Sequence, residues 1–266
     1  MAQHNTPSDE EQAAAALPFP TVRIIGVGAP FQWIAQGLSD LKACPVASLF
    51  YGFCFTAMGL LLTFVFEHAY QYTSALTTGF LLLAPFLAMG LYELSRRREL
   101  GEKCALVPTL TVWRRNAGNL AVFAAVLTVI FLIWARASLV IFAIFYTREL
   151  PNLSGFLGQV LSFENLDFLL VYFGVGLIFA LLVFAVSVVS IPLMLDRNQD
   201  AITSMIASIR ALALNPLPLL IWAALIVSLT ILGFLSFHLG LVVLMPIVGH
   251  ATWHAYRQLV EPLPRN

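Results

Sequence analysis

Residues 119–145 read NLAVFAAVLTVIFLIWARASLVIFAIF, an apolar run that contains a single charged residue, Arg136. A helix needs roughly 20 apolar residues to cross the hydrocarbon core of a bilayer. Backbone polar groups inside lipid must find their hydrogen bonds within the same segment, so a run of this kind predicts a transmembrane helix. The run is longer than a perpendicular span requires, which predicts a tilted helix or one that extends beyond the bilayer.

Five further apolar runs surround this one along the chain. With it they predict six transmembrane helices, at about 46–66, 75–94, 119–145, 166–195, 216–235 and 238–256. Hydrophobic residues make up 60% of the 266 residues and charged residues 11%, whereas a soluble domain has about 25% charged residues. We therefore expect an all-α polytopic membrane domain over residues 23–260, between a disordered cytoplasmic tail at 1–22 and a short cytoplasmic tail at 261–266.

The distribution of basic residues predicts the orientation, because Lys and Arg accumulate on the cytoplasmic side. With the N-terminus inside, 12 of the 14 Lys and Arg residues lie on the inner side. Only Arg148 lies on the outer side, and Arg136 lies within a span. Both termini are therefore expected in the cytoplasm.

A threefold pattern runs along the chain. Short amphipathic segments at Pro30–Pro45, Leu106–Gly118 and Asp196–Pro216 each precede two predicted transmembrane helices, and each carries Lys or Arg. Basic amphipathic helices at such places favour the inner membrane interface. The pattern indicates three units, each an interfacial helix plus a hairpin, with chance similarity among apolar segments as the alternative.

Two histidines, His250 and His254, stand four residues apart on the last predicted helix. At this spacing both imidazoles lie on one helix face and can bind a metal or a haem iron. The alternative is that both histidines bond to inner headgroups or to neighbouring helices. Neither HExxH nor an acidic residue accompanies the pair, and we expect no cofactor.

Two charged residues within predicted spans are candidates for function, since ionisable groups at membrane depth are costly. Arg136 is either a buried functional residue or the point at which its helix reaches the outer interface, as the nearby Trp134 favours. Glu93 is either a proton or cation site or an interface residue that pairs with Arg96–Arg98.

The basic residues that follow the second helix predict contacts with anionic lipid headgroups. They are Arg96, Arg97, Arg98, Lys103, Arg114 and Arg115. The formal net charge of the chain is zero, which argues against nucleic acid as a partner.

Motifs of enzymes and of cysteine-based sites are not evident. The sequence contains no P-loop, GxGxxG, GxSxG or kinase signature, so we expect no catalytic residues and no enzyme activity. The three cysteines, Cys44, Cys54 and Cys104, form no CxxC motif, and their spacing predicts neither a zinc site nor a disulfide framework.

Three stretches resemble a family of bacterial inner-membrane proteins, domain of unknown function 2189. They are FLLLAPFLAMGLYELSRRRELGE at Phe80–Glu102, SIPLMLDRNQDAITSMIASIRALALNPLPLLIWAALIVSLTILGF at Ser190–Phe234, and PIVGHATWHAYRQLV at Pro246–Val260. The resemblance extends over roughly residues 26–261 and implies a multi-pass protein of the bacterial inner membrane. Some members are labelled cytochrome c oxidase subunit I, which has more spans and more histidines than this chain. The family offers no established active site.

These observations favour a non-enzymatic accessory, scaffold or assembly factor that binds membrane lipids or a membrane complex, a respiratory complex included. The first alternative is a transporter or channel for ions or small molecules, with Arg136, Glu93 or His250 along a polar path. The second is a haem- or metal-binding membrane protein that uses His250 and His254.

Overall fold

The computed structural model describes residues 19–68, 73–145 and 165–262. The predicted tails at 1–22 and 261–266 therefore lie mostly outside the described residues. The described elements are helices α2 (Ala29–Ala43), α3 (Pro45–His68), α4 (Thr73–Glu99), η2 (Val107–Asn116), α5 (Ala117–Phe145), α7 (Leu166–Ser187), α8 (Ser190–Arg197), α9 (Ala201–Leu214), α10 (Pro216–Leu235) and α11 (Leu241–Leu259).

Four stretches of helix are long and apolar enough to cross a membrane. They are Pro45–Val65, Val107–Phe145, Leu166–Arg197 and Pro216–Leu235. They correspond to the first, third, fourth and fifth of the six predicted spans. The second predicted span lies in α4, and many of its side chains lie outside the described part. The sixth corresponds to α11, which is not among the four. The all-helical membrane fold is thus confirmed, whereas the number of six spans stays a prediction.

The element order repeats three times along the chain. A short helix (α2, η2 or α9) precedes two longer helical stretches: α3 and α4, then α5 and α7–α8, then α10 and α11. Within each unit the two longer stretches pack on each other. Each short helix also packs on the second stretch of another unit: α2 on α11, η2 on α4, and α9 on α7 and α8. The three units therefore close into a ring.

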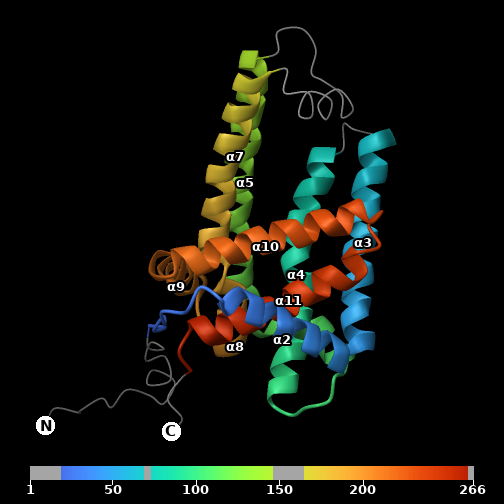
Figure 1. The fold of residues 1–266 in the computed structure, drawn as a ribbon, viewed down its shortest axis with the longest axis vertical. Helices are drawn as coiled ribbons and strands as arrows, with labels where there is room; N and C mark the ends of the chain where they lie inside the picture. The colour runs from blue at the N-terminus through green and yellow to red at the C-terminus, as the bar shows by residue number, and fades with distance from the viewer. Residues whose placement is uncertain (1–18, 69–72, 146–164, 263–266) are drawn as a thin grey trace, which may run out of the picture.

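The short helices lie toward one end of the molecule, and several of the long helices extend away from that end (Figure 1). In Figure 1, α3, α4, α5 and α7 run along the long axis, whereas α2, α10 and α11 run across it. The first and last described segments meet at the base, because Val22 and Val260 form an antiparallel bridge and Arg23 N donates to Leu259 O at 2.8 Å.

Local sequence signals set several helix boundaries. Pro45 and Pro216 begin α3 and α10, as expected for a residue that lacks an N–H and fixes a helical φ. The Asp200 side chain caps α9 by accepting from Thr203 N at 2.8 Å, which satisfies one of the free donors of the first turn. Asn198 ends α8 in the left-handed conformation, with φ of 52°.

The predicted single helix at 166–195 is broken in the structure between α7 and α8. In a continuous helix the Ala185 carbonyl would accept from Val189 N. Instead the Ser208 hydroxyl from α9 lies between the two groups: it donates to Ala185 O at 2.7 Å and accepts from Val189 N at 3.5 Å. A side chain inserted into the backbone ladder bends a helix, and here that side chain comes from another unit.

Helix α11 lies close to both α2 and α3, and glycines permit the approach. A Cβ at Gly37 on α2 would lie 2.6 Å from Ile247 O and 2.9 Å from Ala251 N. A Cβ at Gly52 on α3 would overlap the backbone carbonyl of Val242. Backbone atoms cannot move aside as a flexible side chain can. Only glycine at these two positions therefore lets α11 pack this closely against α2 and α3.

Substitution of these glycines is therefore expected to weaken the fold. Gly52→Ala and Gly37→Ala should each lower the free energy of unfolding by about 1–3 kcal/mol through overpacking. The melting temperature of the full chain in detergent measures the change.

The matched control is Gly118→Ala in α5, where a Cβ meets nothing within 4 Å. This change should stabilise the helix by about 0.5–1 kcal/mol, since alanine loses less backbone entropy than glycine. Equal melting temperatures for the Gly52→Ala and Gly118→Ala proteins would contradict the packing described for α11.

Candidate functional site

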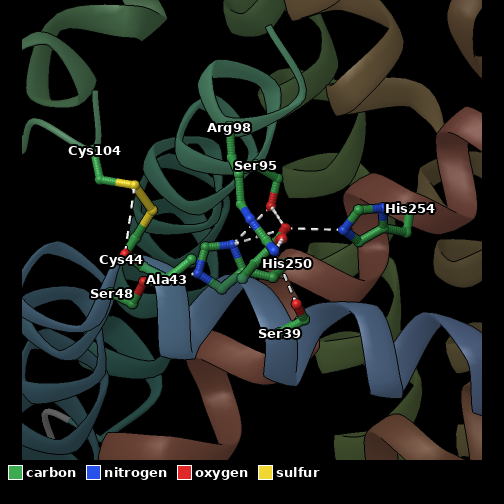
Figure 2. Close-up of a disulfide and its surroundings, with 10 residues drawn as sticks. Ser39, Ala43, Cys44, Ser48, Ser95, Arg98, Cys104, His250 and His254 are labelled. Atoms are coloured by element: carbon green, nitrogen blue, oxygen red, sulfur yellow. Dashed lines mark hydrogen bonds and ion pairs between the residues drawn. A yellow bond between two sulfur atoms is a disulfide. The ribbon is translucent and has the colours of Figure 1, made fainter. Parts of the chain in front are cut away.

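A buried carboxylate, that of Asp40 on α2, collects polar side chains from two other helices. Asp40 is only 2% exposed. Its Oδ2 accepts from Ser95 Oγ of α4 at 2.5 Å and bonds His254 Nε2 of α11 at 2.8 Å. The Arg98 guanidinium of α4 pairs with the other oxygen and also donates to Ser39 Oγ at 2.9 Å. Figure 2 shows Ser95, Arg98 and His254 arranged around this point.

His250 extends the network from Ser95 to α3. Its Nδ1 lies 2.7 Å from Ser95 Oγ and its Nε2 lies 2.8 Å from Ser48 Oγ. The single hydroxyl hydrogen of Ser95 is used toward Asp40, so Ser95 Oγ accepts from His250 Nδ1–H. In a neutral imidazole Nε2 is then the acceptor, and Ser48 donates to it. The result is a directed chain, Ser48 to His250 to Ser95 to Asp40, in which each buried group is satisfied.

The surroundings of Asp40 change its acidity. Burial by itself would raise the pKa of this carboxyl, but the hydrogen bonds from His254 and Ser95 and the charges of the two histidines outweigh burial and lower the pKa from 3.8 to about 2. Hydrogen bonds to the ionised form have this effect on carboxylates. Asp40 is therefore an anion at any physiological pH.

A second buried carboxylate, Glu93, lies on α4 and is also 2% exposed. Arg96 and Arg115 each reach both of its oxygens, at 2.8–3.0 Å and 2.9–3.0 Å respectively. Arg97 Nε lies 3.1 Å from Oε1. Arg115 belongs to η2, so this cluster fixes the second unit to α4 of the first. Bidentate arginine pairs of this kind are strong and specific in geometry.

The other basic residues predicted from the sequence have different surroundings. Arg98 pairs with Asp40, as described above, while Lys103 and Arg114 are exposed. The Arg114 guanidinium lies over the Trp113 ring, 5.3 Å from its centroid. Arg136 is exposed on α5, and its place at the outer interface or in a buried functional site stays a prediction.

The histidine nitrogens that face the network are used in contacts between helices. Both ring nitrogens of His250 and Nε2 of His254 have protein partners. Among the residues that the structure describes, no three histidine, cysteine, aspartate or glutamate side chains are grouped as a metal site requires. These hydrogen bonds join α2, α3, α4 and α11.

The three units are fastened at their corners by equivalent contacts. At the end of η2, Asn116 Nδ2 donates to Met194 O at 3.0 Å and to Gln199 O, just before α9, at 2.8 Å. After α9, Asn215 Nδ2 donates to Arg23 O at 3.0 Å, and its Oδ1 accepts from Ile25 N, ahead of α2, at 2.8 Å. In each case the residue at the end of one short helix holds the segment that precedes the next.

The third corner is a disulfide between Cys44 and Cys104. Cys44 follows α2, as Asn215 follows α9, and Cys104 precedes η2. The prediction of no disulfide is therefore wrong for this pair, whereas Cys54 is free. The spacing gave no signal, because the two residues are 60 positions apart and only the fold brings their Cα atoms to 5.5 Å.

Sequence reasoning missed Asp40, Ser95 and Ser48. A signal for Asp40 was present: it follows Trp33 by seven residues in the first amphipathic segment, so that helical spacing places it on the same face as this tryptophan. An acidic residue at such a position needs buried partners. The serines carry no comparable signal, since small polar residues occur throughout membrane helices.

Loss of the Asp40 charge should destabilise the protein and change its response to acid. Asp40→Asn leaves Arg98 and His254 without their anion, and we expect a loss on the order of 3 kcal/mol at neutral pH. In the wild type the pKa is lower in the folded state, so the carboxylate stabilises the fold above about pH 4 and this contribution disappears as the pH falls toward 2. Asp40→Asn should lack this loss.

Thermal unfolding in detergent at several pH values measures both effects. The control is Ser39→Ala, which removes only the hydrogen bond to Arg98 and should change stability by less than about 0.5 kcal/mol. An Asp40→Asn protein as stable as the wild type, with the same decline below pH 4, would be incompatible with the network.

Comparison with known proteins finds one similarity, which covers part of the chain. No curated protein and no solved structure matches the chain. Residues 73–196 match the family model of domain of unknown function 2189, described as a predicted integral membrane protein. This range holds Glu93, Ser95 and Arg98 and includes Phe80–Glu102, the first stretch that carried the resemblance. Over residues 73–196 the chain is therefore similar to this family of predicted integral membrane proteins.

Proposed function

We propose that the protein is a non-enzymatic scaffold of the bacterial inner membrane, whose α5–α7 hairpin binds the transmembrane helices of a partner complex. The observation that carries this proposal is the exposure of the hairpin. In α5, a fully described helix, the buried residues are Leu120, Phe123 and Ile141. Between Phe123 and Ile141 the helix covers about five turns with no buried side chain.

The same holds for α7, whose buried residues Phe168, Leu169 and Val186 lie near its two ends. The hairpin holds itself together through aromatic contacts: Trp134 lies 5.5 Å from Tyr172 and 5.6 Å from Phe179 between ring centroids. Apart from Arg136, the outward faces of both helices are largely apolar, with Val129, Leu177 and Ile178 more than half exposed. Packing between apolar helices associates proteins within a bilayer, and this hairpin contains the two least buried of the four candidate spans.

The polar base supports a static role. Asp40, Glu93 and His250 are buried in contacts that join helices at one end of the molecule, and within the described residues the buried charged side chains are confined to that end. A transporter requires polar groups along the depth of the bundle. The middle of α5 and α7 presents apolar side chains instead, and Arg136 faces outward.

The proposal includes six spans, with α4 and α11 completing the set and with α10 and α11 strongly tilted relative to α3, α4, α5 and α7 (Figure 1), and both termini in the cytoplasm. The bridge between Val22 and Val260 supports a common side for the two ends. The short helices α2 and α9 support an interfacial position, since they expose Phe31 and Leu38, and Ile202, Ile206 and Ile209 respectively. Their apolar faces would then lie in acyl chains, with lipids as the second partner.

The orientation is tested by fusing reporters to the two ends of the full chain. A fluorescent protein that folds only in the cytoplasm should be active at either end, and alkaline phosphatase, which needs the periplasm, should be inactive at both. Phosphatase activity at one or both ends would overturn the proposed orientation.

The scaffold role is tested by photo-crosslinking in the native membrane. A photoreactive phenylalanine analogue is placed at Val129 or Leu177 on the hairpin, and at Leu60 on α3 as a control of similar exposure. We expect one discrete protein adduct from both hairpin positions, several-fold stronger than any adduct from Leu60. Adducts with lipid alone at all three positions would refute the scaffold proposal.

A further inference from the structure

We propose that Cys44 and Cys104 form a reversible thiol–disulfide site, at which dithiol reductants and disulfide oxidants open and close one corner of the ring. The two other corners are held by the side chains of Asn116 and Asn215, which bond to backbone groups of the next unit. The structure places a cysteine pair at the equivalent point of the third corner. One of three otherwise similar fastenings is thus covalent and responsive to redox chemistry.

The two sulfur atoms differ in accessibility. Cys44 is 3% exposed, at the junction of α2 and α3, while Cys104 is exposed on the connection between α4 and η2. Thiol–disulfide exchange requires that an attacking thiolate reach one sulfur, and exposed disulfides are the labile ones. A reductant therefore attacks the Sγ atom of Cys104, and the Cys44 thiolate is the leaving group.

The reaction balances without a further reagent. A thiolate of the dithiol reductant bonds to Cys104 Sγ, the bond between the two protein sulfurs breaks, and the Cys44 thiolate takes a proton. The second thiol of the reductant then attacks the mixed disulfide and releases Cys104, which is also protonated. The reductant becomes a disulfide and has supplied two electrons. Glutathione disulfide closes the site in two exchanges: one cysteine thiolate attacks it and releases a first glutathione thiol, and the other cysteine thiolate attacks the mixed disulfide and releases the second.

Other contacts confine the effect to a short segment. On the α4 side, Glu102 N donates to Arg97 O at 2.8 Å, and the side chains of these residues form an ion pair at 3.3 Å. On the η2 side, Thr109 Oγ1 lies 2.7 Å from Tyr51 Oη of α3. Leu106 O also accepts from Thr109 N at 2.9 Å, so reduction releases residues 103–105, while the Asp40 network keeps α2 in place. The site changes the accessibility of this segment and leaves the fold intact.

The reduced form would dominate in the cytoplasm, where thiol systems keep cysteines reduced; this placement rests on the orientation proposed above. The chemistry of the site does not depend on it, because the purified full chain in detergent can be equilibrated with glutathione buffers of any ratio. Failure of the topology experiment and failure of the redox experiment are therefore distinguishable.

The experiment combines thiol labelling with limited proteolysis. After equilibration, the protein is unfolded in denaturant that contains N-ethylmaleimide, and mass spectrometry should find only Cys54 modified in oxidising buffer and all three cysteines modified in reducing buffer. Trypsin cleavage after Lys103, next to the disulfide, should be several-fold faster in reducing buffer. Cys104→Ser and Cys44→Ser should each cleave at the fast rate in both buffers, and the control Cys54→Ser should respond as the wild type does.

Either of two results would overturn the proposal. The first is that labelling of Cys44 and Cys104 does not depend on the buffer. Both would then be labelled even in oxidising glutathione buffer, or both would stay unlabelled even in the most reducing glutathione buffer. The second is equal cleavage after Lys103 in both buffers, despite a change in labelling. Because Cys104 is exposed, the Cys104→Ser protein is expected to fold, and its rate remains informative even if Cys44→Ser does not.

Discussion

The fold depends on compensating one buried anion, the carboxylate of Asp40. An ionised carboxyl removed from water loses several kcal/mol of solvation unless cations and donors surround it. The compensation comes from Ser95 and Arg98 of α4 and from His254 of α11, so α2 cannot be buried without both helices. His250 then extends the requirement to α3 through Ser48. A single charge thus determines how the first and third units of the chain meet.

The ring of three units follows from a general property of helix ends. The last carbonyls of a helix and the extended segments between helices leave backbone groups without partners. Asn116 and Asn215 satisfy such groups in a neighbouring unit, so each fastening also completes the hydrogen bonding of a chain break. Where Cys44 and Cys104 take this place, the connection is made by a covalent bond. Breaking the bond between Cys44 and Cys104 would therefore leave the backbone hydrogen bonds of Asn116 and Asn215 unchanged.

The sequence predicted the apolar helices well and the contacts between them poorly. Burial in lipid depends on hydropathy along the chain, and the predicted helix at 119–145 corresponds to α5 to within two residues. The break at Val189 was missed because its cause, Ser208, belongs to another unit. Asp40 and the disulfide were missed for the same reason, since their partners are 55 to 214 positions away. Such contacts leave no periodic trace in a single sequence.

The division between base and hairpins explains why polar candidates did not lead to the proposed function. Glu93 and His250 attract attention because charge and imidazole within predicted spans suggest chemistry, yet each is saturated by partners that fix helices. The long helices α5 and α7 keep a free surface that is apolar apart from Arg136. A rigid base can hold such a hairpin at a constant angle, so that a partner helix meets a preformed surface and loses less conformational freedom on binding. In this protein the buried polar residues would therefore fix the positions of the helices, and the apolar residues of α5 and α7 would contact the partner.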